Sequence, residues 1–258
     1  SEKSLYDKGL VPCAEPFQKL VHQGMILGSN GIKMGKRFPE YVVDANVVVK
    51  EYGADTLRLY EMFMGPLEAD KPWDNNGIEG SRKFIDRIWR LYTEDNRISD
   101  SENKNLEKIY HQTVKKVTED YEALKFNTAI AAMMIFVNAV YKETVFPREY
   151  AEGFVKLLNP LAPHMTEELW STVLGHNPTL ANETWPTYDE EKTKDDEITI
   201  VIQINGKLRD KVNVSATASK EEIEAAALNT PRVKELLEGL TIRKVIVVPG
   251  KLVNIVAA

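Results

Sequence analysis

The spacing of apolar and polar residues divides the chain into stretches with different periods. Residues 1–65 alternate turns with short apolar runs. Within them, Gly24–Gly28 predicts a short buried strand, and residues 47–52 and 55–64 predict two short helices that end at glycines. From residue 76 to residue 175, apolar positions recur with the period of an α-helix, which predicts an antiparallel helical bundle.

Two helices of the bundle can be placed from the pattern. Residues 128–140 are apolar on nearly every side, which predicts a central helix. Residues 150–158 predict another helix, which Asn159 and Pro160 end. Thr166 is placed to cap the next helix, because a threonine hydroxyl can accept a hydrogen bond from an unpaired amide of the first turn.

A charged stretch separates the bundle from the end of the chain. Residues 186–197 hold six Asp or Glu and two Lys, which predicts a linker too charged to pack firmly. Beyond it, Asn205-Gly206 lies between two β-branched runs and predicts a hairpin. A helical stretch over 220–237 and two further apolar runs complete the pattern, at residues 244–248 and 252–256.

Together these elements predict a mainly α protein with a small α+β domain. The expected parts are residues 1–65, a helical bundle over 66–185, a linker over 186–197 that tethers the last domain, and an α+β domain over 198–258.

Composition narrows the class of protein. The 258 residues are 43% hydrophobic with a mean hydropathy of -0.33, which is typical of a globular chain. The longest apolar run, residues 129–137, is about half of the roughly 18 residues that a membrane span needs. Cys13 is the single cysteine. An internal disulfide is therefore excluded, and we expect a cytoplasmic protein with no membrane partner.

The net charge of -6 is unevenly distributed along the chain. Residues 1–65 sum to zero, residues 66–197 to -9 and residues 198–258 to +3. Only the last stretch favours a polyanion, and only mildly. An ordinary scatter of surface charge is the competing interpretation.

No metal site is predicted. The four histidines are scattered, and His164 with Glu167 and Glu168 fits neither spacing known from zinc proteases. The sequence also offers no Ser or Cys nucleophile with a local base.

The strongest candidate for chemistry is Gly-Ile-Lys-Met-Gly-Lys-Arg at residues 31–37. It is not a P-loop, because Asn30 stands where that motif needs Gly, and Arg37 where it needs Ser or Thr. Three cations in five residues on a glycine-bracketed loop suit contact with a polyphosphate, because lysine ammonium groups stabilise the charge that develops during in-line attack at phosphorus. A solvated basic turn is the alternative.

Lys33-Met34-Gly35-Lys36-Arg37 resembles the KMSKS loop of the class I aminoacyl-tRNA synthetases. Residues 17–28 and 52–66 resemble the bacterial leucyl-tRNA synthetases closely, and residues 203–209 resemble the start of their C-terminal domain. Residues 161–170 resemble a bundle helix that the leucyl, isoleucyl, valyl and methionyl enzymes share. The resemblance covers nearly the whole chain in the same order. The loop is common to the class, whereas residues 52–66 are far more specific.

The resemblance implies roles for these residues. Residues 1–65 would be the remnant of a class I nucleotide-binding domain, the bundle would dock tRNA(Leu), and the terminal domain would contact the corner of the tRNA. Lys36 would contact ATP and stabilise the transition state of amino-acid activation, with Lys33 as its supporting partner. Met34 would lie with them in the ATP site, and Mg2+ would arrive with ATP as a substrate complex.

Two features depart from the family pattern. Gly35 and Arg37 stand where the loop has serines, and Phe38-Pro39-Glu40 replaces the usual Lys-Gly-Asn. No His-x-Gly-His motif occurs in the sequence. We therefore expect a monomeric C-terminal portion of a longer leucine-tRNA ligase, inactive alone, with the leucine pocket outside this chain.

Two other interpretations remain open. One is a non-enzymatic tRNA-binding module derived from a class I synthetase, and intact Lys33 and Lys36 count against it. The other is a different class I enzyme, such as the valyl or isoleucyl enzyme, against which residues 52–66 and the terminal domain count.

In the terminal domain, basic residues near the strands are the predicted tRNA contacts. They are Lys207, Arg209 and Lys211, with Arg243 and Lys244. Alternation along a strand predicts that the first three share one face. The alternative is a basic edge that protects an exposed strand from pairing with another chain.

Overall fold

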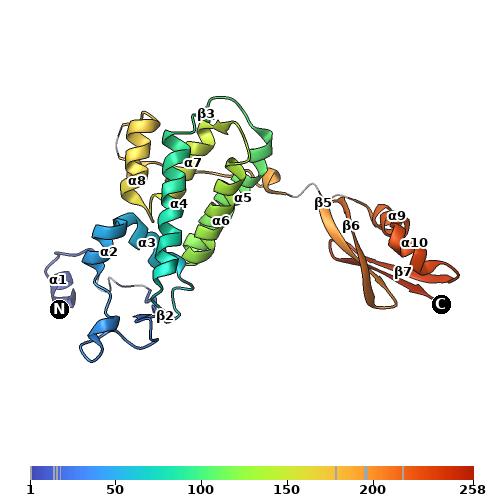
Figure 1. Cartoon of the computed structure of the whole chain (residues 1–258), viewed down its shortest axis with the longest axis horizontal. Helices are drawn as coiled ribbons and strands as arrows, with labels where there is room; N and C mark the ends of the chain where they lie inside the picture. The colour runs from blue at the N-terminus through green and yellow to red at the C-terminus, as the bar shows by residue number, and fades with distance from the viewer. Residues whose placement is uncertain are drawn as a thin grey trace. The chain divides into compact units, whose positions relative to one another are not determined.

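The computed structural model describes residues 2–13, 15, 17, 19–177, 179–194, 197–216 and 218–258. The chain divides into two compact units, Ser1–Lys192 and Thr193–Ala258, and Figure 1 shows the elements of each. The boundary between the units falls inside the predicted linker. Among the described residues, no helix has both the length and the apolar character needed to cross a membrane.

The first unit begins with short elements joined by turns. Its elements are α1 (Glu2–Asp7), β1 (Ile26–Leu27), the 3-10 turn η1 (Pro39–Tyr41), α2 (Ala45–Tyr52), α3 (Ala54–Phe63) and β2 (Lys71–Pro72). Strands β1 and β2 pair in parallel. Asp44 caps α2 by accepting from the amide of Asn46. Gly53, at φ +92°, lets α2 end and α3 begin at once.

The bundle follows in the same unit. Its described helices are α4 (Asn75–Thr93), α5 (Lys104–Glu122), α6 (Phe126–Val140), α7 (Arg148–Leu158) and α8 (Pro163–Glu168), which continues as a π-helical turn over Leu169–Val173. The short strands β3 (Ile98–Ser99) and β4 (Phe146–Pro147) pair in parallel. Ile130, Met133 and Phe136 of α6 are almost fully buried, which confirms the predicted central helix.

Thr166 does not cap a helix, so that prediction is wrong. Because α8 already begins at Pro163, Thr166 lies inside it and donates its hydroxyl to a carbonyl of the preceding turn. The amides at the start of α8 are capped from another helix. The carboxylate of Asp55, on α3, accepts from the amides of His164 and Met165.

Residues 185–192, called the tail segment below, lie along α5. Trp185 donates its indole N–H to a threonine hydroxyl of α5 at 2.8 Å. Lys192 forms an ion pair with Glu107 of α5 at 2.6 Å. The prediction that residues 186–197 are too charged to pack firmly is therefore wrong for the tail segment, because α5 supplies groups that match its charges.

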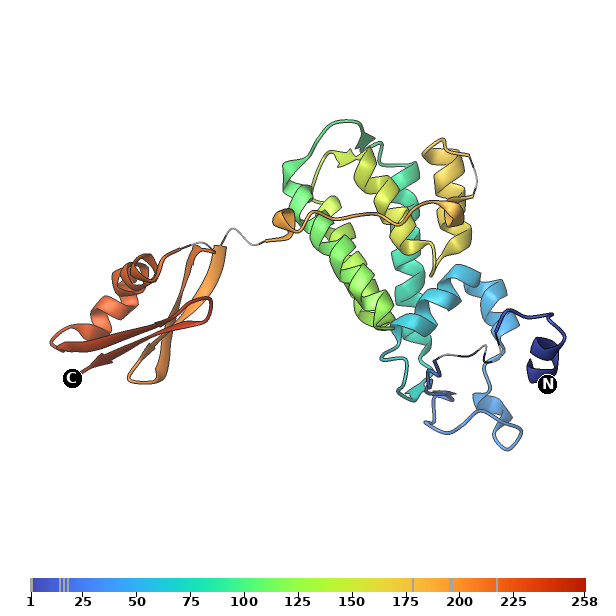
Figure 2. The same cartoon turned by 180° about the vertical axis from the view of Figure 1, so that it is seen from behind.

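The described residues of the second unit form a four-stranded sheet with two helices on one face. Its elements are β5 (Glu197–Ile204), β6 (Lys207–Ser215), α9 (Lys220–Asn229), α10 (Pro231–Leu237), β7 (Ile242–Val248) and β8 (Leu252–Ala257), with strand order β6-β5-β8-β7. Both helices lie on the same side of the sheet (Figure 2) and share its buried core, which includes Ile202 and Ile255.

Local sequence signals account for the turns of this unit. Asn205 and Gly206 both have positive φ, at 51° and 77°, which is the backbone of the predicted hairpin turn. The helical stretch predicted over 220–237 is two helices, because Thr230 is extended and Pro231 begins α10. The predicted fold class, mainly α with a small α+β domain, is confirmed.

Candidate functional site

The basic loop begins with a turn that folds back on β1. The amide of Gly28 donates to the carbonyl of Ile32 at 2.9 Å, and Lys33 forms an antiparallel bridge with Leu27. Gly28 is required at this point, because a Cβ there would lie only 2.9 Å from the Cβ of Tyr41. The turn therefore brings the start of the loop close to its far end.

Met34 packs against the protein rather than standing in solvent. Its sulfur accepts a hydrogen bond from the amide of Val43 at 3.4 Å. The two residues also pack against a buried cluster of Val48, Tyr60, Trp73 and Ile78. Residues 35–42 are called the Lys36 loop below. The contact between Met34 and Val43 joins the residue directly before this loop to the residue directly after it.

The side chains of the loop differ in what they touch. Lys33 and Lys36 are exposed, and among the described residues neither side chain has a hydrogen bond or an ion pair. Arg37 instead lies 5.3 Å over the ring of Phe38, whose amide donates to the carbonyl of Gly35 at 3.1 Å. The residues that depart from the KMSKS pattern thus form a local turn and leave both lysines available to an anion.

A cavity of about 440 Å³ lies between the Lys36 loop and the start of α4. Its walls include Tyr41 from the loop and Trp73 from the segment before the helix. Asp74 also lines it and caps α4 by accepting from the amide of Asn76 at 3.0 Å. Neither Lys33 nor Lys36 lines this cavity, so the side chains of both lysines would have to move to reach a molecule bound in it.

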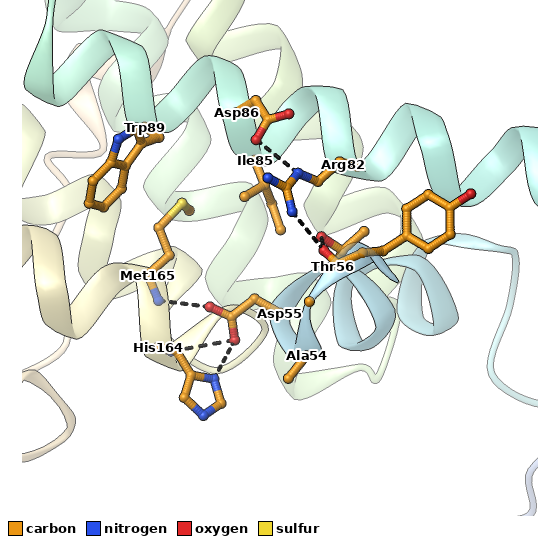
Figure 3. A pocket seen from close by; sticks show the side chains of 11 residues that line it. Ala54, Asp55, Thr56, Arg82, Ile85, Asp86, Trp89, His164 and Met165 are labelled. Carbon is orange, nitrogen blue, oxygen red and sulfur yellow. Dashed lines mark hydrogen bonds and ion pairs between the residues drawn. The ribbon is translucent and has the colours of Figure 1, made fainter. Parts of the chain in front are cut away.

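A second cavity, of about 550 Å³, lies where α3, α4 and α8 meet (Figure 3). Ile85, Trp89 and Met165 give it an apolar wall. At its rim, Arg82 forms an ion pair with Asp86 at 2.9 Å.

Asp55 is the residue of this junction that the sequence analysis missed. Its carboxylate, only 9% exposed, accepts a hydrogen bond from Nδ1 of His164 at 2.8 Å and from the amide of Met165 at 2.7 Å. These contacts hold α3, which follows the Lys36 loop and α2, against the bundle (Figure 3). The partners lie 109 and 110 positions away in the sequence, so no local pattern could reveal the pairing.

In the second unit, a β-bulge separates the predicted tRNA contacts. Lys211 lies opposite Val201, but a register shift places Lys207 opposite Ile204 and leaves Arg209 without a partner. Ile204 belongs to the buried core, whereas Val201 faces the other side of the sheet. The prediction of a single shared face is therefore wrong, because the bulge puts Lys207 and Lys211 on opposite faces.

A second bulge lies in β7, where Arg243 is skipped between Ile242 and Lys244. Lys244 lies opposite Val256, on the face that carries no helix among the described residues. This is also the face of Lys211. The structure thus brings these two lysines to one face, on the two edge strands. They lie three strand spacings apart across the sheet and four residues apart along it, which is roughly 20 Å.

Two protein-family models together match most of the chain. Residues 10–74 match the family described as tRNA synthetases class I (I, L, M and V). Residues 103–225 match the family described as the anticodon-binding domain of tRNA ligase. The second match runs from α5 through the tail segment to α9.

Among solved structures, the chain is similar to the LeuRS agnB2 of Agrobacterium radiobacter K84, crystallised as a ternary complex with tRNA and LeuAMS. The similarity covers all of this chain, with 32% sequence identity and a TM-score of 0.78. The chain spans 36% of the length of that LeuRS chain.

Proposed function

We propose that the chain belongs to the class I tRNA synthetases and forms the loop-bearing and tRNA-docking part of a longer leucyl-tRNA synthetase. The observation that carries this proposal is the similarity of the whole chain to a LeuRS at 32% identity. The order of the two family matches, first residues 10–74 and then residues 103–225, agrees with it.

The longer protein would join leucine to tRNA(Leu) in two steps. The carboxylate of leucine would attack the α-phosphorus of ATP, which forms leucyl-adenylate and releases pyrophosphate. A hydroxyl of the terminal ribose of the tRNA would then attack the carbonyl carbon and release AMP. The leucine pocket would lie outside this chain.

Lys36 would act in the first step. Its ammonium group is exposed and can follow the charge that develops on the phosphates. Lys33, at the foot of the loop, would support it. Mg2+ would enter bound to ATP as part of the substrate. Among the described residues, no group of three or more His, Cys, Asp or Glu side chains is placed to hold a metal ion.

The bundle and the terminal unit would dock tRNA(Leu). The anticodon-binding family match supports this for the bundle. In the terminal unit, residues 198–258 carry a charge of +3, and Lys211 and Lys244 share the face without helices. The exposed, unpaired Cys13 is compatible with the reducing conditions of the cytoplasm, where we place this activity, with the protein as a monomer.

The proposal is tested by ATP–pyrophosphate exchange with the longer protein and each of leucine, isoleucine, valine and methionine. Exchange that depends on leucine is the expected result. Exchange with valine or isoleucine instead would identify another member of the family. Exchange with none of the four, together with retained tRNA binding, would identify a non-enzymatic tRNA-binding module.

This chain by itself provides a second measurement. We expect no exchange, because it would lack the leucine pocket and positioning of both substrates supplies a large share of the rate. Robust leucine-dependent exchange by the isolated chain would contradict this part of the proposal.

A further inference from the structure

We propose that Met34 is a positioning residue that holds the base of the Lys36 loop, and that it does not contact ATP. This inference rests on the proposed function, because it concerns how Lys36 is brought to its substrate. It replaces the expectation that Met34 is part of the ATP site.

The first argument is the geometry of the loop. The sulfur of Met34 accepts from the amide of Val43 at 3.4 Å, so one contact joins the residues directly before and after the loop. Close approach of Gly28 to Tyr41 holds a second pair of positions together. With its ends fixed, residues 35–42 have fewer conformations to sample.

The second argument is the space around the Met34 side chain. It lines an apolar cavity of about 130 Å³ together with Ile26, Val43, Leu57 and others, with Glu61 at the wall. Burial raises the pKa of the Glu61 carboxyl, while the nearby Arg58 lowers it, so the acid lies in a poorly hydrated place. An unbranched thioether adapts to an irregular space of this kind better than a branched side chain does.

The third argument is the difference between Met34 and its neighbours. Met34 and Val43 are half-buried, whereas Lys33, Gly35 and Lys36 are exposed. Because the Met34 side chain packs against the protein, it fixes the backbone positions from which the neighbouring Lys33 and Lys36 side chains extend. It leaves the lysine side chains free to move toward a phosphate.

The contact predicts a measurable effect in this chain without any reference to catalysis. Amide hydrogen exchange of Val43 should be slow in the native chain, because its N–H is bonded to the sulfur. Met34→Ala should raise that exchange by about tenfold, since one hydrogen bond and its packing are lost. Met25→Ala is the matched control, because Met25 is exposed and lies outside the cluster. Unchanged Val43 exchange in Met34→Ala would overturn the proposal.

The longer protein supplies the functional readout. Met34→Ala should lower kcat of ATP–pyrophosphate exchange by about tenfold, with KM for ATP and for leucine little changed, because misplacement of a catalytic group slows the chemical step. Met34→Leu should recover most of the rate, because leucine also fills the apolar space. Met25→Ala should behave as wild type.

The outcomes separate this inference from the proposed function. A raised KM for ATP with unchanged kcat in both Met34 variants would mean that Met34 contacts ATP, which overturns the inference. Absence of leucine-dependent exchange in the wild-type longer protein would overturn the proposed function, and with it the role of Lys36. The Val43 measurement would in that case still decide whether Met34 holds the loop.

Discussion

The chain presents basic side chains in two regions, and the fold holds them in different ways. In the Lys36 loop, Met34 and Val43 join the two ends and Gly28 lies close against Tyr41, while Lys36 lies beyond both contacts. In the terminal sheet, Lys211 and Lys244 stand in β6 and β7, and pairing with the neighbouring strands sets the backbone position and the face of each. The backbone that carries Lys36 is held by fewer contacts than the backbone that carries Lys211 and Lys244.

This difference matches two kinds of anion. Charge that develops on a reacting phosphate appears during the reaction, so a cation that moves a short distance can follow it. The phosphates of a folded RNA keep a fixed spacing, so cations fixed on a sheet can match them in advance. The comparison therefore supports the proposals of chemistry at the loop and of tRNA binding at the sheet, and each proposal can be tested separately.

The largest effect is expected from Lys36→Ala in the longer protein. Loss of a cation that acts in the transition state should slow leucyl-adenylate formation by about 100- to 1,000-fold, by analogy with other preorganised electrostatic groups. KM for leucine should stay unchanged. Lys50→Ala, which removes an exposed lysine from the last turn of α2, is the matched control. If Lys36→Ala showed the wild-type rate of ATP–pyrophosphate exchange, Lys36 would have no role in adenylate formation.

The next effect concerns the terminal sheet. The double variant Lys211→Ala and Lys244→Ala should weaken tRNA binding and lower the slope of log affinity against log salt by about two, one for each phosphate contact. The matched control is the pair Lys220→Ala and Lys234→Ala, which removes two cations from the helices on the opposite side.

Two outcomes would change this assignment. Equal losses in the control pair would mean that binding follows the net charge of the unit and not one face. If no change followed when Lys207, Arg209 and Lys211 were replaced together with Lys244, these residues would serve only to protect the sheet edges.

The sequence predicted the elements well where the signal is local. The helix over α6 and the Asn205-Gly206 hairpin follow from periodicity and turn chemistry. It failed where the outcome depends on a distant partner. The cap of α8 is Asp55, which lies 109 positions away. The local sequence contains no sign of it, so the nearby Thr166 was predicted instead. The bulge at Arg209 has no glycine or proline to mark it, so strict alternation assigned the wrong face.

The tail segment failed for a related reason. Its charges are typical of a linker when read alone, and only the opposite charges on α5 show that the segment can pack. A cluster of charge in a sequence is therefore evidence about structure only when the charges of its neighbours in space are known.

A smaller effect is expected in the tail segment. Its packing on α5 sets the length of unpacked chain that precedes the terminal sheet. Removing the ion pairs of Lys115 with Glu190 and of Lys192 with Glu107, by replacing both lysines with Ala, should speed cleavage by a Glu-specific protease within the segment by about three- to tenfold. The effect is small because exposed ion pairs contribute little to stability. Asp100→Ala, which removes an exposed pair with Arg148, is the control.

The wild-type cleavage pattern tests the same point. We expect the first cuts beyond Lys192, where the boundary between the units lies. Fastest cleavage before that residue would mean that the tail segment is not held on α5 in solution.

The smallest effect is expected from pH, through His111 of α5. The amide of Asp189 donates to Nδ1 of His111 at 3.1 Å, which requires that nitrogen to be unprotonated. Burial lowers the pKa of His111 from its ordinary value of 6.5, and Lys192 lowers it further, whereas Glu107, Asp189 and Glu149 act in the opposite direction. Tyr110 and Tyr150 supply the aromatic neighbours of the ring.

The sign of the pH effect follows from this lowered pKa. Because the folded chain binds the proton of His111 more weakly than the unfolded chain, the stabilisation is complete above about pH 6.5 and is lost as pH falls through the lowered pKa. Exchange of the Asp189 amide, corrected for its intrinsic pH dependence, should therefore rise between pH 7 and pH 5. The rise should be about fivefold at most, since one neutral hydrogen bond contributes about 1 kcal/mol. His111→Asn offers an acceptor that does not titrate and should flatten the profile. An equal rise in His111→Asn would assign the pH dependence to the carboxylates of the tail segment instead.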